Sequence, residues 1–123
     1  METLQQNIVR DLKDIEDEMG SPSFQWQGST YNFIPSITEV KRDLDNGGFV
    51  IDLLMSSTVR SFDIQCDDDG EEILVPTFLN GYPSSQQKIV YTLDGNTYRI
   101  QLIKMDPTNS YFRMIGVCPN RGI

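Results

Sequence analysis

The sequence predicts a mainly β protein, a small antiparallel β-barrel or sandwich with one N-terminal α-helix. Apolar residues recur at helical spacing near the N-terminus, but at every second position in short runs across residues 24–118. The length of 123 residues suits one domain. We therefore expect an N-terminal helix at 1–20, a barrel at 24–118 with a long loop at 67–87, and a flexible tail at 119–123.

The helix is expected over residues 4–19. Thr3 and Gln6 have the spacing of a capping box, and Gly20 supplies a stop signal. One stripe of the helix is apolar, with positions three or four residues apart: Leu4, Ile8, Leu12, Ile15 and Met19. Five acids follow on the other face: Asp11, Asp14, Glu16, Asp17 and Glu18. The stripe either packs on the barrel or forms a docking face, and the acids either face solvent or dock a basic partner.

The first half of the barrel begins with a hairpin. Phe24 and Trp26 precede a Gln-Gly-Ser-Thr turn, and Tyr31 and Phe33 follow it, which predicts two short strands. Residues 35–48 are polar and end in an Asp-Asn-Gly-Gly turn signal. The run that follows alternates in its second half and predicts one long strand or a bent pair of strands, residues 49–66.

The second half of the barrel begins after residues 67–87, which prolines and glycines punctuate and which we expect to form the long loop. Strands are expected at 88–93 and 96–105, joined by Asp94-Gly95, the strongest type I′ turn signal in the chain. A turn at Asp106-Pro107 leads to the last strand. The order indicates a meander of five to seven strands.

An acidic run marks the expected loop: Asp67, Asp68, Asp69, Glu71 and Glu72. A calcium-binding EF-hand loop has Gly at its sixth position and Glu at its twelfth, but aligning Gly70 to the sixth places Pro76 at the twelfth. The pattern fails, so we expect a solvated loop and no metal, with a looser divalent-cation site as the alternative.

Catalysis is not expected. The sequence has no histidine, which removes the commonest general base and metal ligand. Cys66 and Cys118 lie far apart at the ends of apolar strand segments, which favours unpaired, buried thiols in a reducing compartment. No apolar run reaches the roughly 18 residues of a membrane span, and no secretory signal is visible. We therefore expect no enzyme activity, no cofactor and no membrane partner.

Aromatic and basic residues lie close together near the C-terminus, a pattern found in some nucleic-acid-binding proteins. Tyr98, Tyr111 and Phe112 lie near Arg99 and Arg113 and could stack on bases. The net charge of −8 argues against a phosphate-binding surface, and aromatic residues are common in ordinary strands.

The C-terminal run QQKIVYTLDGNTYRIQLIKMDPTNSYFRMIGV, residues 86–117, resembles the closing strands of small neck proteins of tailed bacteriophages. These are called head-tail joining, head completion or stopper proteins. The runs FQWQGSTYNFIPS and NGGFVIDLLMSSTVRSF, residues 24–36 and 46–62, resemble their first strands. The resemblance covers most of residues 24–117 and rests on the order and spacing of these motifs.

This resemblance implies a structural virion protein, made in the cytoplasm of the host bacterium and located in the neck. It implies a homo-oligomeric ring of β-barrels between the portal or adaptor proteins and the tail proteins. DNA passes through such a ring without sequence-specific binding. Alternatives are a tail terminator or tail-completion protein, and a small non-enzymatic β-barrel binding module.

The resemblance also implies a role for the expected loop, which in stopper-type members reaches toward the DNA channel or the neighbouring ring. Its candidate residues here are Asp67, Asp68, Asp69, Glu71, Glu72, Leu74, Phe78 and Leu79. Acids facing a channel repel phosphates, so a ring of such loops fits a lumen that must release DNA. The apolar stripe of the helix is the second candidate docking face.

Overall fold

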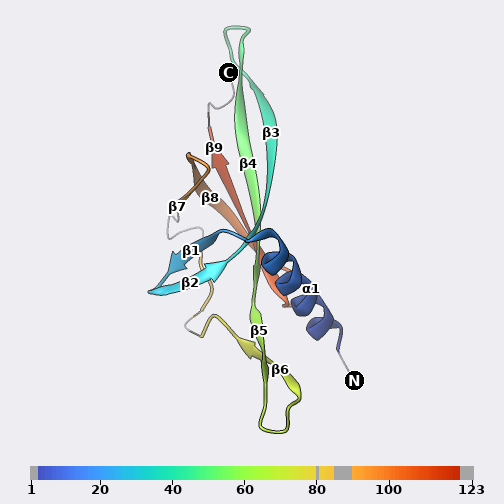
Figure 1. Ribbon diagram of the computed structural model, residues 1–123. Coiled ribbons are helices and arrows are strands. Elements are labelled where there is room, and N and C mark those ends of the chain that lie inside the picture. The colour runs from blue at the N-terminus through green and yellow to red at the C-terminus, as the bar shows by residue number, and fades with distance from the viewer. Residues whose placement is uncertain (1–2, 80, 85–89, 120–123) are drawn as a thin grey trace.

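The computed structural model describes residues 3–79, 81–84 and 90–119. The protein is mainly β with one N-terminal helix, and its largest sheet has five antiparallel strands that curl into a half-barrel (Figure 1). This confirms the fold class predicted from the sequence. In the part of the chain that the structure describes, no helix is long and apolar enough to cross a membrane.

The helix α1, Leu4–Met19, begins and ends where the sequence predicts. The N–H of Gln6 donates to Thr3 Oγ1 at 3.1 Å, and the N–H of Thr3 donates to Gln6 Oε1 at 2.8 Å. These two bonds are the predicted capping box. Gly20 adopts a left-handed conformation with φ 61°, and its N–H donates to the carbonyl of Glu16 to end the helix.

Two predicted hairpins are confirmed. Strands β1, Ser23–Trp26, and β2, Ser29–Asn32, flank Gln27 and Gly28, both with positive φ. Strands β7, Val90–Leu93, and β8, Asn96–Met105, flank Asp94 and Gly95, again with positive φ at both positions. This is the conformation that type I′ turns require. Residues 88 and 89, expected at the start of the first strand of this second pair, lie outside the described residues.

The five-stranded sheet has the order β3-β4-β9-β8-β7. Besides β7 and β8, this sheet contains three further strands: β3, Ile34–Asp43, β4, Phe49–Arg60, and β9, Tyr111–Cys118. The predicted meander of five to seven strands is wrong in detail, because the described residues form nine strands and the last one inserts between β4 and β8. In this central position both edges of β9 are paired, and its apolar residues Phe112 and Met114 are fully buried.

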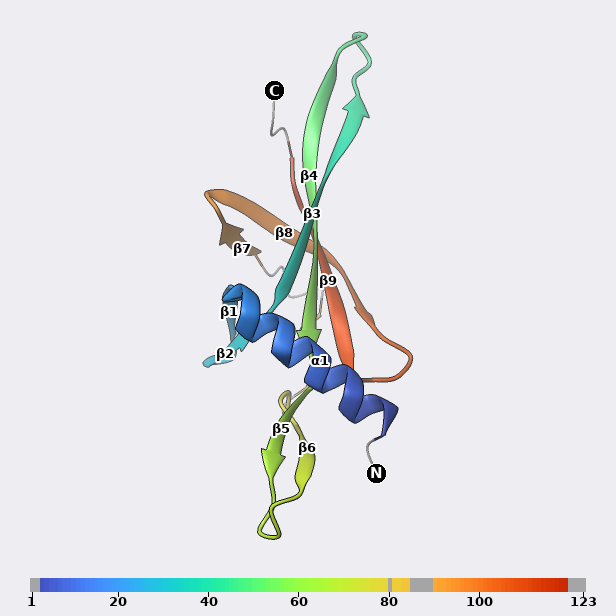
Figure 2. The ribbon, with the colours of Figure 1, turned by 45° about the vertical axis from the view of Figure 1, so that its right-hand side comes forward.

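Strand β3 was not predicted. Strand β9 pairs with β4 from Leu53 to Arg60, whereas β3 continues along β4 as far as Phe49. The outer part of the β3–β4 hairpin therefore projects beyond the sheet as an arm (Figures 1 and 2). All residues of β3 from Ser36 to Asp43 are exposed. Because neither face is buried, the sequence shows no period-two apolar pattern there.

A second hairpin projects from the opposite end (Figure 1). Strand β5, Phe62–Cys66, pairs with β6, Glu72–Pro76. The expected loop at 67–87 is therefore partly a strand, and the run 49–66 is the bent pair, β4 followed by β5. Pro76 lies at the last position of its strand, where a missing N–H is tolerated. Residues 80, 85–87 and 120–123, the last including most of the predicted flexible tail, lie outside the described residues.

The core lies on one face of the sheet. Side chains of β4, β8 and β9 form the sheet side of the core, and β1, β2 and the segment after β6 pack against them. The covering residues are aromatic: Phe78 stacks on Tyr31 with ring centroids 4.2 Å apart and meets Phe112 edge-on at 5.1 Å. Interlocking rings of this kind fix the hairpin β1–β2 against the sheet.

Gly116 lies in a crowded part of this core. A Cβ atom there would lie 3.0 Å from Ile100 Cδ1 and 3.2 Å from the carbonyl oxygen of Arg99. Gly116→Ala should lower the free energy of unfolding by about 1–3 kcal/mol, because overpacking forces neighbours to shift. Urea unfolding measures the change. The control Gly48→Ala, at the exposed tip of the arm, should change stability by less than about 0.5 kcal/mol; equal effects of the two variants would contradict this packing.

Candidate functional site

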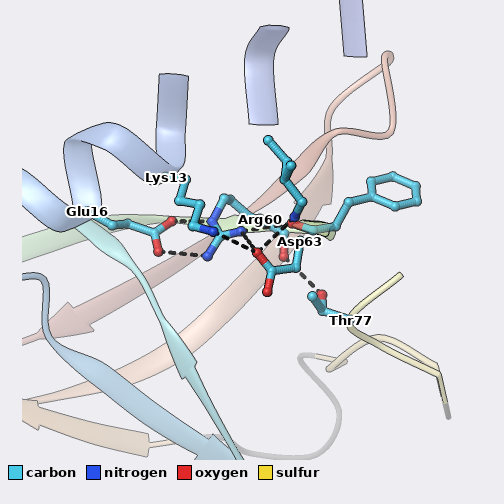
Figure 3. A network of polar contacts seen from close by, with 7 residues as sticks. Lys13, Glu16, Arg60, Asp63 and Thr77 are labelled. Atoms are coloured by element: carbon cyan, nitrogen blue, oxygen red, sulfur yellow. Dashed lines mark hydrogen bonds and ion pairs between the residues drawn. The ribbon is translucent and has the colours of Figure 1, made fainter. Parts of the chain in front are cut away.

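The helix α1 is fastened to the sheet by a buried ion pair (Figure 3). Glu16 is 3% exposed, and its carboxylate accepts two bonds from Arg60 of β4. Arg60 Nε lies 2.7 Å from Oε2, and the second contact, to Oε1, is 3.2 Å. This two-point geometry matches the planar guanidinium to the carboxylate and sets the rotation of the helix about its axis.

The same guanidinium joins the helix to the β5–β6 hairpin. Arg60 Nη1 donates to the carbonyl of Phe62 at 3.0 Å and to Asp63 Oδ1 at 3.1 Å. Lys13 of the helix reaches the same carboxylate at 3.6 Å. Thr77 Oγ1 donates to the carbonyl of Arg60 at 3.3 Å (Figure 3). One arginine therefore connects the helix, the sheet and the hairpin.

The electrostatic surroundings stabilise these charges. Burial by itself lowers the pKa of Arg60, but the hydrogen bonds and charges of Glu16 and Asp63 outweigh it and raise the pKa. Burial likewise opposes ionisation of Asp63, yet the N–H of Ile64, Arg60 and Lys13 together lower the pKa of its carboxyl. Both groups are thus held in their charged forms.

Three further contacts fasten the helix along its length. Arg10 forms an ion pair with Glu72 of β6, and Gln6 Nε2 donates to the carbonyl of Glu72 at 3.4 Å. Gln5 Nε2 donates to the carbonyl of Thr108, in the turn before β9, at 3.2 Å. The side of α1 that faces the protein is therefore largely polar, apart from the fully buried Val9.

This polar docking leaves much of the apolar stripe uncovered. Leu4 is 67% exposed, Ile15 44% and Met19 45%, whereas Ile8 and Leu12 are half-buried. At about 100° per residue, the buried positions Val9 and Glu16 lie to one side of the stripe rather than at its centre. The structure thus leaves Leu4, Ile15 and Met19 available as part of the predicted helix docking face.

The predicted acidic residues gather at the tip of the β5–β6 hairpin, but they differ in environment. Asp67 closes the turn, because its Oδ1 accepts the N–H groups of Asp69 and Glu71, each at 2.9 Å. Asp68, Asp69 and Glu71 are exposed, while Glu72 is tied to the helix. Asp67 and Glu72 therefore have structural roles. The tip presents three carboxylates to solvent.

The apolar residues predicted for the same loop are also divided. Phe78 is a core residue, only 7% exposed, and does not lie on a docking surface. Leu74 is half-buried on β6, and Leu79 is 81% exposed. The prediction missed the burial of Phe78 because an aromatic residue between two prolines carries no periodic signal.

Two of the three aromatic residues named beside Arg99 and Arg113 lie away from them. Tyr98 and Phe112 are fully buried in the core, whereas the exposed Arg99 and Arg113 and the half-buried Tyr111 lie on the opposite face of the sheet. Both cysteines are free thiols, but Cys66 is exposed rather than buried as expected. Among the described residues, no three Cys, Asp or Glu side chains are grouped so that they could hold a metal ion.

The chain was compared with known proteins. No protein-family model matches it, and neither a curated protein nor a solved structure is similar enough to count as a match.

The anchoring pair can be tested by removing one or both charges. Arg60→Met should lower the free energy of unfolding by about 3–5 kcal/mol, because it leaves the Glu16 carboxylate buried without its cation. The double variant Glu16→Leu with Arg60→Met should regain a large part of that loss, since no uncompensated charge remains. Urea unfolding of the two single variants and the double variant gives the coupling; strict additivity would contradict a shared buried pair.

Acid should loosen this attachment. Because the folded-state pKa of Asp63 is lowered, its stabilising contribution is complete above the unfolded value of about 4 and is lost as pH falls through the folded value. The pKa of Asp106 is also lowered, by bonds from Thr108, so it contributes in the same window. Asp63→Asn should flatten the fall in stability below about pH 4. Unfolding measured across this range checks it, and an unchanged slope would exclude Asp63 as a contributor.

Proposed function

We propose that this protein is a structural component of a tailed-phage neck, acting as one subunit of a ring that connects the portal side of the capsid to the tail. The half-barrel fold is compatible with this proposal, which the sequence resemblance motivates. The protein contributes by assembly: subunits pack side by side, and projecting parts contact the tiers above and below.

The observation that best supports an assembly role is the exposed stripe of α1. An isolated subunit would be expected to bury Leu4, Ile15 and Met19, yet the helix is fixed by ion pairs in a rotation that leaves them in solvent. Apolar side chains held outward by a specific polar anchor are typical of a surface covered in a larger assembly.

The two projecting hairpins are suited to contacts between tiers. The β3–β4 arm and the β5–β6 hairpin extend from opposite ends of the body (Figures 1 and 2). In a ring whose axis runs along the long dimension of the subunit, each end meets a different neighbouring tier. The acids Asp68, Asp69 and Glu71 then form a repeated band of negative charge, which repels DNA phosphates when it faces the channel.

Deletion of this protein from the phage that encodes it tests the proposal directly. Electron microscopy should show DNA-filled heads beside separate, finished tails, because the connecting tier is absent. Heads beside tails of uncontrolled length would instead indicate tail termination. Normal joined virions would exclude both roles.

The acidic tip is tested by Asp68→Asn, Asp69→Asn and Glu71→Gln made together. Asp67 is left intact because its carboxylate closes the turn. We expect altered DNA retention or ejection, measured as the fraction of particles that keep their genome and by the ejection rate. The control replaces three exposed acids elsewhere, Asp17, Asp45 and Asp94, by Asn. If both triple variants behave like the wild type, the acids are only a solvated turn.

A further inference from the structure

The outer face of the five-stranded sheet carries an apolar patch. Residues opposite each other on neighbouring strands share a face. Leu54 lies opposite Val117, and Leu102 lies opposite Ile115, on the face away from the core. Leu102 is 50% exposed, and the other three side chains are half-buried. We call these four residues the outer patch.

Three cations border the outer patch on the same face. Arg99 lies opposite Val117, and Lys104 lies opposite Arg113. All three are exposed, and none of them forms an ion pair with a carboxylate in the described part of the chain. The influence of Arg113 on Asp106 is the weakest of those that lower the pKa of that carboxyl. The outer patch therefore has a basic border inside a chain whose net charge is −8.

Two shallow hollows lie at this border. Lys104, Arg113, Tyr111 and the acidic residue Asp106 line one of about 160 Å³, and Arg99 with Val117 lines another of about 180 Å³. Both are smaller than the roughly 300–1,000 Å³ of typical small-molecule sites. Their size suits the ends of single side chains from a protein surface. The second hollow, whose described lining includes Arg99 and no acid, suits the end of an acidic side chain.

The exposed side of α1 has the complementary chemistry. At about 100° per residue, Asp11 and Glu18 lie beside Leu4 and Ile15, and Asp14 lies next to them, away from the buried Val9 side. All three acids are exposed and make no ion pair with another described residue. The helix thus offers an apolar centre with three acids, and the sheet offers an apolar centre with three bases.

We propose that the exposed side of α1 of one copy packs on the outer patch of a second copy. This inference rests on the proposed ring and names its subunit interface. The three acids of the helix match the three cations of the sheet, and each set surrounds an apolar centre, which favours a second copy as the partner. DNA is disfavoured because the chain as a whole is acidic and repels it. Each subunit carries both surfaces, so the contact can repeat from copy to copy.

The dimensions allow this packing. A 16-residue helix is about 24 Å long, and the three strands β4, β9 and β8 span roughly 10–15 Å. The chain's own α1 docks on Arg60, which lies opposite Tyr111 at one end of the same face. The rest of the face is left for the neighbouring copy.

Cross-linking tests the contact. In a Cys66→Ser background, which removes the exposed thiol, Ile15→Cys and Leu102→Cys are made in separate chains and mixed. A short bismaleimide should join them into covalent dimers, in concentrated protein and in purified particles. The control partner Asp45→Cys, at the exposed tip of the arm, should give only background. Absence of the first dimer in both samples, or equal dimer with the control, would overturn the interface.

Charge reversal tests the electrostatic match. Changing Asp11, Asp14 and Glu18 to Lys, or Arg99, Lys104 and Arg113 to Glu, should each reduce the cross-link more than about tenfold. Mixing the two reversed chains should restore it, because each contact between the two different chains pairs opposite charges. Circular dichroism confirms folding of each variant. Failure of the mixture to recover, with both chains folded, would rule out this pairing.

The outcomes separate this interface from the proposed function. If the cross-link forms but particles lacking the protein join normally, the interface stands and the neck function falls. If particles need the protein but neither the cross-link nor the rescue is seen, the neck function stands and the subunits meet elsewhere.

Discussion

The pairing of Glu16 with Arg60 is the interaction on which the arrangement of the molecule depends. A carboxylate that is almost fully buried must keep its cation, so the helix cannot rotate about its axis without losing a two-point contact. The same arginine holds the first residues of β5 through the Phe62 carbonyl and Asp63. The orientation of α1 and the direction of the β5–β6 hairpin are therefore set together, at the end of β4.

Because α1 docks through polar residues, part of its apolar stripe lies on the surface of the protein. A helix that docked through its apolar stripe would gain more from burial, but its acids would then flank the contact and its outer side would be polar. Instead, Glu16, Arg10 and Lys13 of α1 form ion pairs with charged residues of the strands. The apolar residues are turned outward instead, where an assembly can use them.

The sequence predicted those parts of the fold that local chemistry decides. The helix bounds follow from Thr3, Gln6 and Gly20, because caps act within a few residues. The two hairpins follow from their glycine-containing turn signals, of which only Asp94-Gly95 predicted the type I′ conformation. Strand β3 was missed because an arm exposed on both faces has no apolar period. The place of β9 between β4 and β8 depends on pairing over long distances in the chain, which local patterns do not encode.

The candidate site residues could be predicted as groups from the sequence, but their individual roles could not. The acids at 67–72 were recognised as a group, but the use of Asp67 as a turn acceptor and of Glu72 as a partner of Arg10 depends on the folded geometry. Of the cations on the outer sheet face, Arg99 and Arg113 were considered only beside Tyr98, Tyr111 and Phe112, and Lys104 was not considered. Strand alternation would have separated the buried aromatics from the exposed Arg99 and Arg113, since neighbouring residues in a strand point to opposite faces.

Strands β4 and β5 follow one another along the length of the molecule, interrupted at the buried Ser61 (Figure 2). This path has a mechanical meaning. Tension applied between the arm and the acidic hairpin runs along the extended backbone of β4 and β5, so covalent bonds carry it and the hydrogen bonds to β3 and β9 need not open. A protein built in this way resists stretching along its long axis.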